Sequence, residues 1–168
     1  VARNLLALES ILADLDQNLV RANSGEQALK CLLNQEFAVI LLDVQMPGMD
    51  GFETAELIRQ RDESRHTPII FITATTDDES AVLHGYSLGA VDFVFKPIVP
   101  EVLKAKVNVF VDLFMLRVSE RQRLEEARNR DREQYERELG MIERVSSARQ
   151  TSVTAGMFGQ HPLSGKLS

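Results

Sequence analysis

The sequence contains one cysteine and no tryptophan, and its acidic residues outnumber its basic ones. A single cysteine, Cys31, excludes an internal disulfide framework and fits a reducing compartment. With 19 basic and 25 acidic side chains, the chain lacks the basic surface that general nucleic-acid binding requires. No apolar run approaches the roughly 18 residues of a membrane span, and no basic-then-apolar leader opens the chain. These absences predict a soluble, cytoplasmic protein without direct nucleic-acid or membrane binding.

The 168 residues fall into three regions of different composition. Residues 1–116 alternate short apolar runs with amphipathic stretches and suffice for one domain with its own core. Residues 117–145 are dominated by charges of both signs, which predicts a solvated helical or coiled-coil linker. Residues 146–168 are rich in Ser, Gly and Gln and predict a flexible tail or the start of an output domain. Because the sequence starts at Val1 without a methionine, we expect it to be a fragment.

The first region has the pattern of an α/β protein. Its apolar runs are short, nearly unbroken and rich in β-branched and aromatic residues, as in strands that are covered on both faces. These runs are Asn18–Arg21, Ala38–Asp43, Pro68–Thr73 and Val91–Lys96. Helical patterns alternate with them, and their predicted starts are Ser24 with Gln27, Asp50 with Glu53, Thr76 with Glu79, and Pro100. The alternation predicts a parallel sheet.

Three of the predicted strands end in residues of complementary chemistry. Asp43 follows the run AVILL, Thr73 follows IIFI, and Lys96 follows VDFVF. Because ligands of open α/β sheets bind beyond the carboxyl ends of the strands, a carboxylate, a hydroxyl and an ammonium group are expected at one edge. Together they provide a nucleophile, a hydrogen-bond donor and a fixed cation. The pattern therefore predicts a site for an incoming phosphoryl group.

The segment after Asp43 carries a longer motif. Residues 43–51 read Asp-Val-Gln-Met-Pro-Gly-Met-Asp-Gly, and with Thr73 and the Lys96–Pro97 pair they match a known family in residue type and spacing. The sequence resembles the receiver domain of two-component response regulators, from Val1 to about Phe114. The resemblance implies a doubly wound, flavodoxin-like parallel sheet of order 2-1-3-4-5, which a long α-helix follows in this chain.

The resemblance also implies a role for each residue of the motif. Asp43 would accept a phosphoryl group from a histidine kinase or a phosphotransfer protein. Lys96 would contact the phosphoryl oxygens, and Thr73 would hydrogen-bond them after transfer. Asp43 and the backbone carbonyl of Gln45 would bind Mg²⁺. Phe93 occupies the aromatic switch position, whose rotamer follows phosphorylation in the family.

The chain departs from the family pattern at its beginning. Response regulators carry an acidic pair after their first strand, and this pair holds the metal. In this chain, the sequence from Val1 onward resembles the residues that follow the acidic pair in the family. We therefore expect the first strand and the acidic pair just before Val1. The resemblance further implies a cis peptide between Lys96 and Pro97, which would aim the lysine inward.

The predicted function is a phosphorylation-controlled switch that is not itself an enzyme. Phosphorylation of Asp43 would change the face built by the helix after Thr76, the strand Val91–Lys96 and the helix from Pro100, and a downstream output would read that change. Two alternatives remain open. One is a receiver-like dimerisation scaffold that works without phosphorylation, and the other is the regulatory part of a larger output enzyme.

The helix from Pro100 predicts a homodimer. From Glu101 to Ser146 no proline intervenes, and the inner half carries two apolar faces where covering the sheet needs one. Farther out, one series at seven-residue spacing is apolar only at its ends, as in a weak, polar-centred coiled coil. That series is Phe114, Arg121, Arg128, Tyr135 and Ile142. The alternative is a single solvated helix that joins two domains.

Gly85, inside the helix predicted after the third run, has two interpretations. It either weakens that helix, so that the helix can shift on activation, or lets Tyr86 or a neighbouring backbone segment pack closely. Asp77 and Asp78 at the start of the same helix are interpreted as caps. The remaining candidate ligands do not have the spacing that is typical of a metal site. They are His66, His84, His161 and Cys31.

Overall fold

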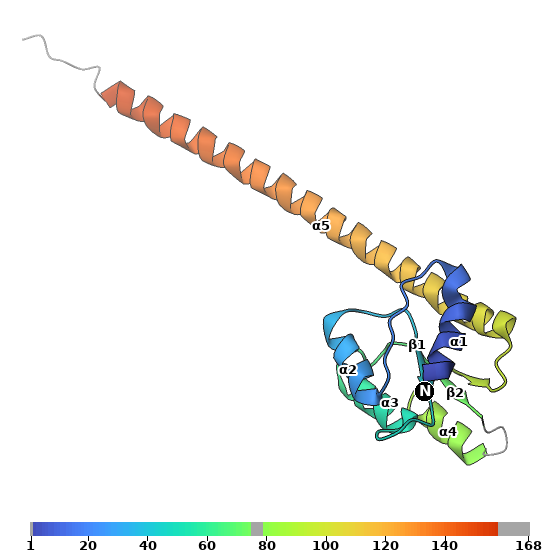
Figure 1. Ribbon diagram of the computed structural model, residues 1–168. Helices are drawn as coiled ribbons and strands as arrows, with labels where there is room; N and C mark the ends of the chain where they lie inside the picture. The colour runs from blue at the N-terminus through green and yellow to red at the C-terminus, as the bar shows by residue number, and fades with distance from the viewer. Residues whose placement is uncertain (1, 75–78, 158–168) are drawn as a thin grey trace, which may run out of the picture. The chain divides into compact units, whose positions relative to one another are not determined.

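A computed structural model describes residues 2–74 and 79–157 (Figure 1). The elements are, in chain order, α1 (Ala2–Leu12), the 3₁₀ turn η1 (Ala13–Leu15), α2 (Gly25–Asn34), β1 (Ile40–Asp43), α3 (Gly51–Gln60), β2 (Ile69–Thr73), α4 (Glu79–Ser87), β3 (Asp92–Phe95) and α5 (Pro100–Met157). The strands form one parallel sheet of order β1-β2-β3. This alternation of helices with parallel strands confirms the predicted α/β fold.

Two helices begin at the capping residues that the sequence indicates. The Ser24 hydroxyl accepts a hydrogen bond from the backbone N–H of Gln27 at 3.2 Å. The Asp50 carboxylate accepts from the Glu53 N–H at 2.8 Å, and the Glu53 carboxylate accepts from the Asp50 N–H at 2.9 Å. This reciprocal pair is a complete capping box, which fixes the start of α3 close to the end of β1. Asp77 and Asp78, predicted as caps of α4, lie outside the described residues.

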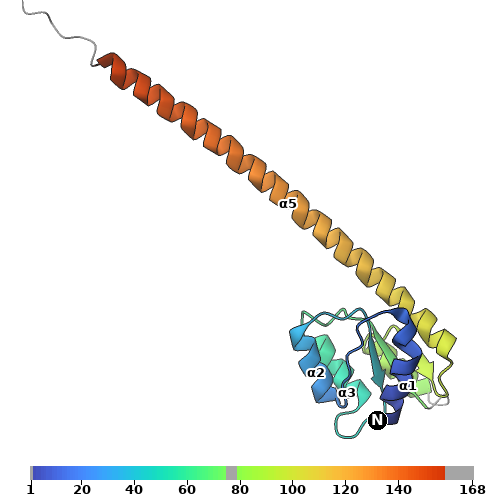
Figure 2. The same ribbon diagram turned by 45° about the horizontal axis from the view of Figure 1, so that its top comes forward.

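The middle strand, β2, separates two apolar cores. All five of its residues are buried, and successive side chains point to opposite faces of the sheet. Ile70 and Ile72 pack in one core with residues of α1 and α5, whereas Ile69 and Phe71 pack in a second core with residues of α2 and α3. Figures 1 and 2 show α2 and α3 together on one side of the sheet and α1 on the other. Helices thus cover both faces, as predicted for a doubly wound fold.

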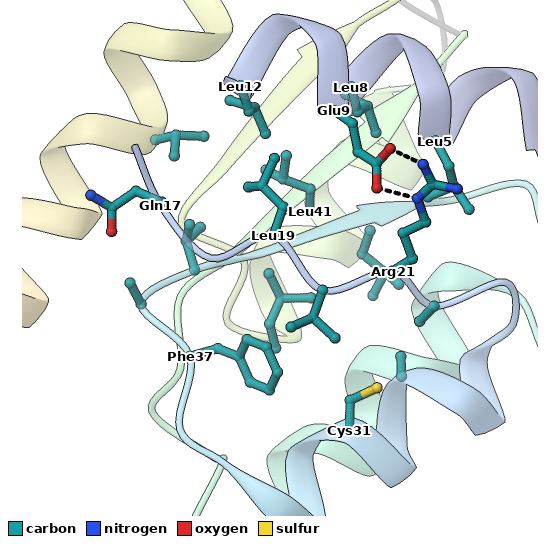
Figure 3. A pocket seen from close by; sticks show the side chains of 18 of the residues that line it. Leu5, Leu8, Glu9, Leu12, Gln17, Leu19, Arg21, Cys31, Phe37 and Leu41 are labelled. Carbon is teal, nitrogen blue, oxygen red and sulfur yellow. Dashed lines mark hydrogen bonds and ion pairs between the residues drawn. The ribbon is translucent and has the colours of Figure 1, made fainter. Parts of the chain in front are cut away.

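The segment Asn18–Arg21 is not a strand, which corrects the prediction from its apolar pattern. In the order that the family implies, this segment pairs with the first strand and not with β1. Among the described residues no strand lies beside this segment, and a strand forms only against a partner for its backbone N–H and C=O groups. Leu19 of this segment and Leu41 of β1 instead line a mainly apolar cavity of about 370 Å³ (Figure 3).

The guanidinium of Arg59, a residue of α3, forms hydrogen bonds with the backbone just before β2 and β3. It donates to the carbonyl oxygens of Thr67 at 2.8 Å, Leu88 at 3.1 Å and Gly89 at 2.7 Å. Its partial burial lowers the pKa of Arg59 below the usual value, and the three carbonyl oxygens offset the loss of hydration. Thr67 precedes β2 and Gly89 precedes β3, so this contact lies at the end of the sheet opposite to Asp43.

The last helix, α5, runs from Pro100 to Met157. Residues 146–157, predicted as part of a tail, are therefore helical. The physical reason is that, from residue 146 onward, the first glycine is Gly156 and the first proline is Pro162, so no helix-breaking residue ends the helix earlier in this stretch. The described residues divide into two compact units, with the boundary between Arg117 and Val118. Within residues 2–74 and 79–157, no helix carries an apolar stretch of the length that crossing a bilayer requires.

Candidate functional site

Asp43, the last residue of β1, accepts hydrogen bonds from three different parts of the chain. The Lys96 ammonium donates to Oδ2 at 2.8 Å, and the side-chain amide of Asn4 donates to the same oxygen at 3.3 Å. The backbone N–H of Gln45 donates to Oδ1 at 2.9 Å. About a fifth of the Asp43 side chain (21%) stays exposed. The carboxylate is thus held by positive and polar donors while it remains open to an incoming group.

The strand pairing brings the predicted site residues to one edge of the sheet. Asp43 lies opposite Ile72, the neighbour of Thr73 in β2. The backbone N–H of Lys96 donates to the Thr73 carbonyl at 2.8 Å, which places the residue after β3 beside the end of β2. Thr73 itself is almost fully buried. The Lys96–Pro97 peptide is cis, as the resemblance implies.

Gly51 allows α3 to begin against the Asp43 backbone. Its N–H donates to the Val44 carbonyl at 3.0 Å. A Cβ atom added to Gly51 would lie 2.4 Å from the Asp43 carbonyl oxygen and 2.8 Å from the Val44 Cα, so a side chain there would displace the loop that carries the site. The sequence shows this glycine as part of the motif, but its contact with Asp43 emerges only from the fold.

Phe93 lies in an aromatic cluster that Gly85 makes possible. The centroid of the Phe93 ring is 5.4 Å from that of Phe71 and 5.2 Å from that of Tyr86, and only 5% of the Phe93 surface is exposed. A Cβ atom on Gly85 would lie 2.4 Å from Phe93 Cζ and 3.2 Å from atoms of Phe52 and Phe71. Of the two interpretations of Gly85, the structure supports close packing, but the groups that pack there are the rings of Phe93, Phe52 and Phe71 instead of the predicted Tyr86 or backbone segment.

A Gly85→Ala substitution is expected to lower the thermal stability. Alanine in a helix gains about 1 kcal/mol over glycine, but overpacking a core costs about 1–3 kcal/mol, and here the new methyl group would overlap Phe93. Gly140→Ala is the matched control, because a Cβ there meets nothing within 4 Å and should leave the melting temperature unchanged or higher. A rise for both variants in thermal denaturation would show that Gly85 is not a packing residue.

An ion pair between α1 and the segment Asn18–Arg21 lines the cavity beside β1. The Arg21 guanidinium donates to both carboxylate oxygens of Glu9 and thereby lowers the pKa of Glu9 (Figure 3). Cys31 also lines this cavity. The Arg21 side chain is 52% exposed and that of Glu9 27%, so water screens the pair and it contributes little stability, but it connects the two segments.

The residues around Asp43 fit a magnesium ion in part. A carboxylate and a backbone carbonyl, from Asp43 and Gln45, are hard oxygen donors of the kind that Mg²⁺ takes, and this ion usually keeps several waters besides one or two carboxylates. Across the described ranges, no group of three or more His, Cys, Asp or Glu side chains lies close enough to hold a metal. Asp43 can therefore serve as one ligand of such an ion but does not form a complete cage.

Comparison with known proteins defines the class. Residues 2–108 match the family model of the response regulator receiver domain, so the chain belongs to this family. It is 42% identical over 102 residues to the transcriptional regulatory protein AfsQ1 of Streptomyces coelicolor, an alignment that covers 61% of this chain and 44% of that protein. It is 40% identical over 87 residues to a probable cyclic di-GMP phosphodiesterase of Vibrio cholerae, covering 52% of this chain and 20% of that protein.

The fold of this chain is also similar to that of a solved structure. The Vibrio cholerae chemotaxis protein CheY4 is 29% identical, with a TM-score of 0.61 over 66% of this chain and 91% of that one. The chain spans less than half the length of the two curated relatives, whose names describe different outputs. The shared part is the receiver domain, a signalling domain of two-component systems.

Proposed function

We propose that this chain accepts a phosphoryl group on Asp43 from a histidine kinase or a phosphotransfer protein and passes the resulting change to a downstream output. The observation that carries the proposal is the Asp43 carboxylate at the sheet edge, held by Lys96 and by the Gln45 N–H. A carboxylate oxygen attacks the phosphorus of the phosphohistidine. The P–N bond breaks as the P–O bond forms, and the imidazole of the donor leaves. Lys96 offsets the negative charge on the phosphoryl oxygens.

Mg²⁺ is the proposed cofactor. Asp43, the Gln45 carbonyl and an acidic pair just before Val1 would hold it, and when bound it would neutralise charge on the phosphoryl oxygens. The cavity beside β1 supports a position for the strand that carries this pair, because Leu12 of α1, Leu19 and Leu41 line it from different elements. A strand in this cavity could pair with β1, and its carboxyl end would then share the edge of the sheet that holds Asp43.

The signal would leave through the face formed by α4, β3 and α5. Thr73 is adjacent to Lys96 through its backbone, and Phe93 packs against Tyr86 of α4, so movement at the site can reach this face. Several apolar side chains are exposed here, among them Tyr86, Phe95 and Val102. These residues and the extension of α5 are the proposed contacts of a homodimer.

Exposed apolar residues on α5, such as Leu124 and Ile142, favour a second candidate function, a dimerisation scaffold that works without phosphorylation. A third candidate is the regulatory part of a larger enzyme, since one relative is named a probable phosphodiesterase. Incubating the full-length protein with acetyl phosphate and Mg²⁺ distinguishes the first two functions. The phosphoacceptor predicts one phosphoryl group per chain in the intact mass, and the scaffold predicts none with either acetyl phosphate or a phosphorylated histidine donor.

Replacing Lys96 with alanine is expected to slow phosphorylation by about 100-fold or more, because the fixed cation facing the transferred group is lost. Stability should change little, since 27% of the Lys96 side chain is exposed and its removal leaves no core cavity. Lys104→Ala is the matched control. Lys104 is 30% exposed and pairs with Asp14 at 2.6 Å, away from Asp43, so this variant should keep the wild-type rate.

Rates from intact mass and melting temperatures should be measured side by side for the two lysine variants. A large loss of stability in Lys96→Ala without any loss of phosphotransfer would identify Lys96 as a structural residue and contradict its proposed role.

A further inference from the structure

Asn4 lies in the first part of α1 and donates to Asp43 across 39 positions of sequence. Its side-chain amide and the Lys96 ammonium both donate to the same carboxylate oxygen, Oδ2. Oδ1 accepts a hydrogen bond from the Gln45 N–H. The two carboxylate oxygens are therefore not equivalent, and Oδ1 is the one with more lone-pair capacity left for a new bond.

The position of Asn4 is fixed by the core and not by the hydrogen bond alone. Leu8, Ile11 and Leu12 of the same helix pack against buried residues of β2 and β3. An amide carried on a helix that is anchored in this way stays near the carboxylate at a low entropic cost. Asn4 itself is exposed, so its side chain contributes little to the core.

The strength of this hydrogen bond depends on the charge of its acceptor. A donor binds an ionised carboxylate more strongly than a neutral carbonyl oxygen. When Oδ1 carries the phosphoryl group, Oδ2 becomes the neutral carbonyl oxygen of an acyl phosphate. When water attacks the phosphorus, the P–Oδ1 bond breaks and its electron pair returns to Asp43 as a carboxylate, while the proton of the water leaves with inorganic phosphate. Negative charge thus returns to the oxygen that Asn4 faces.

We propose that Asn4 is a positioning residue that shortens the lifetime of phosphorylated Asp43, an inference that rests on the phosphoacceptor function proposed above. Through Oδ2 it directs Oδ1 toward the incoming phosphorus, and during hydrolysis it stabilises the carboxylate as the leaving group. The same contact favours the free carboxylate over the acyl phosphate. The domain therefore returns to its unphosphorylated form faster than the ammonium of Lys96 alone would allow.

The test is the decay of the adduct on the full-length protein after acetyl phosphate is removed, followed by intact mass with Mg²⁺ present. Asn4→Leu keeps the approximate size of the side chain and removes the donor, and its adduct should persist about three- to tenfold longer than that of the wild type. Asn4→Gln keeps an amide donor and should restore a decay closer to the wild-type rate. Gln17→Leu is the control, since Gln17 lines the same cavity but donates to the Leu15 carbonyl.

Melting temperatures of all variants separate an effect on the adduct from an effect on folding. If Asn4→Leu does not fold, Asn4→Ala replaces it in the same assay with the same expectation. If the adduct of Asn4→Leu decays at the same rate as the adduct of the wild type, the role of Asn4 is overturned and the phosphoacceptor function is left intact. Equal slowing by the leucine and glutamine variants also overturns it, because it would show an effect of shape and not of the donor. A wild-type protein that forms no adduct overturns both.

Discussion

The Asp43→Asn variant is expected to form no phosphoryl adduct with acetyl phosphate and Mg²⁺, where the wild-type protein forms one. A carboxamide has the shape of the carboxylate, and its single oxygen can still accept one of the two hydrogen bonds, from Lys96 at the place of Oδ2 or from the Gln45 N–H at the place of Oδ1. It lacks the anionic oxygen that attacks phosphorus, so the fold is retained and the chemistry is lost. Intact mass spectrometry of both proteins after the same incubation measures the difference.

Asp50→Asn is the matched control for this experiment. Asp50 is the next acidic residue of the motif and caps α3 through the Glu53 N–H. Asparagine is as good a cap as aspartate, so this variant should fold and form the adduct. An adduct that persists in Asp43→Asn at the wild-type level would show that the nucleophile is another residue.

Ending the chain at Leu116 is expected to convert a dimer into a monomer. The helix beyond this point exposes apolar side chains that nothing in the described chain covers, among them Leu124, Tyr135, Ile142 and Val145. Tyr135 and Ile142 are seven residues apart, and Leu124 and Val145 are separated by a multiple of seven. The four residues therefore occupy two positions of a seven-residue repeat, which is the spacing of a coiled-coil seam. Arg128 and Asp131 interrupt the seam, so the pairing should be weak and sensitive to the attached receiver.

Light scattering of the full-length protein and of the shortened form, at matched micromolar concentrations with and without phosphorylation, measures this effect. Ile142→Asp should separate the dimer, whereas Met141→Asp should not, because Met141 lies outside the seam. Ile142 and Met141 are both apolar and similarly exposed, at 65% and 58%. A difference between the two variants therefore reports the position of the residue on the helix and not the loss of an exposed apolar side chain. Monomers at both lengths and in both phosphorylation states would mean that α5 is a single solvated helix between domains.

Local patterns predict the parts of this fold that depend on local physics. Ser24 and Asp50 mark helix starts because their side chains accept hydrogen bonds from the backbone N–H groups three residues later. The candidate site follows from two local facts combined with one general rule. Asp43 and Lys96 each follow an apolar run, and parallel strands bring their carboxyl ends to one edge.

Contacts between distant segments account for what the sequence leaves hidden. Asn4 and Asp43 are separated by a helix, a turn and another helix, and no pattern in the chain links them. The roles of Gly51 and Gly85 depend on which atoms approach them, and those atoms belong to other elements or to the preceding loop. Asn18–Arg21 has the residues of a strand but forms none, because a strand needs a neighbour as well as a propensity.

The position of the phosphoryl group on the full-length protein is the most direct test of Asp43 as the phosphoacceptor. Sodium borohydride reduces an acyl phosphate to an alcohol, so it converts a phosphorylated aspartate into homoserine, which tandem mass spectrometry can locate in the sequence. After incubation with acetyl phosphate and Mg²⁺, homoserine is expected at position 43 and at no other aspartate. Homoserine at another aspartate, or a phosphoryl group found only on a hydroxyl or imidazole side chain, would contradict the proposed function.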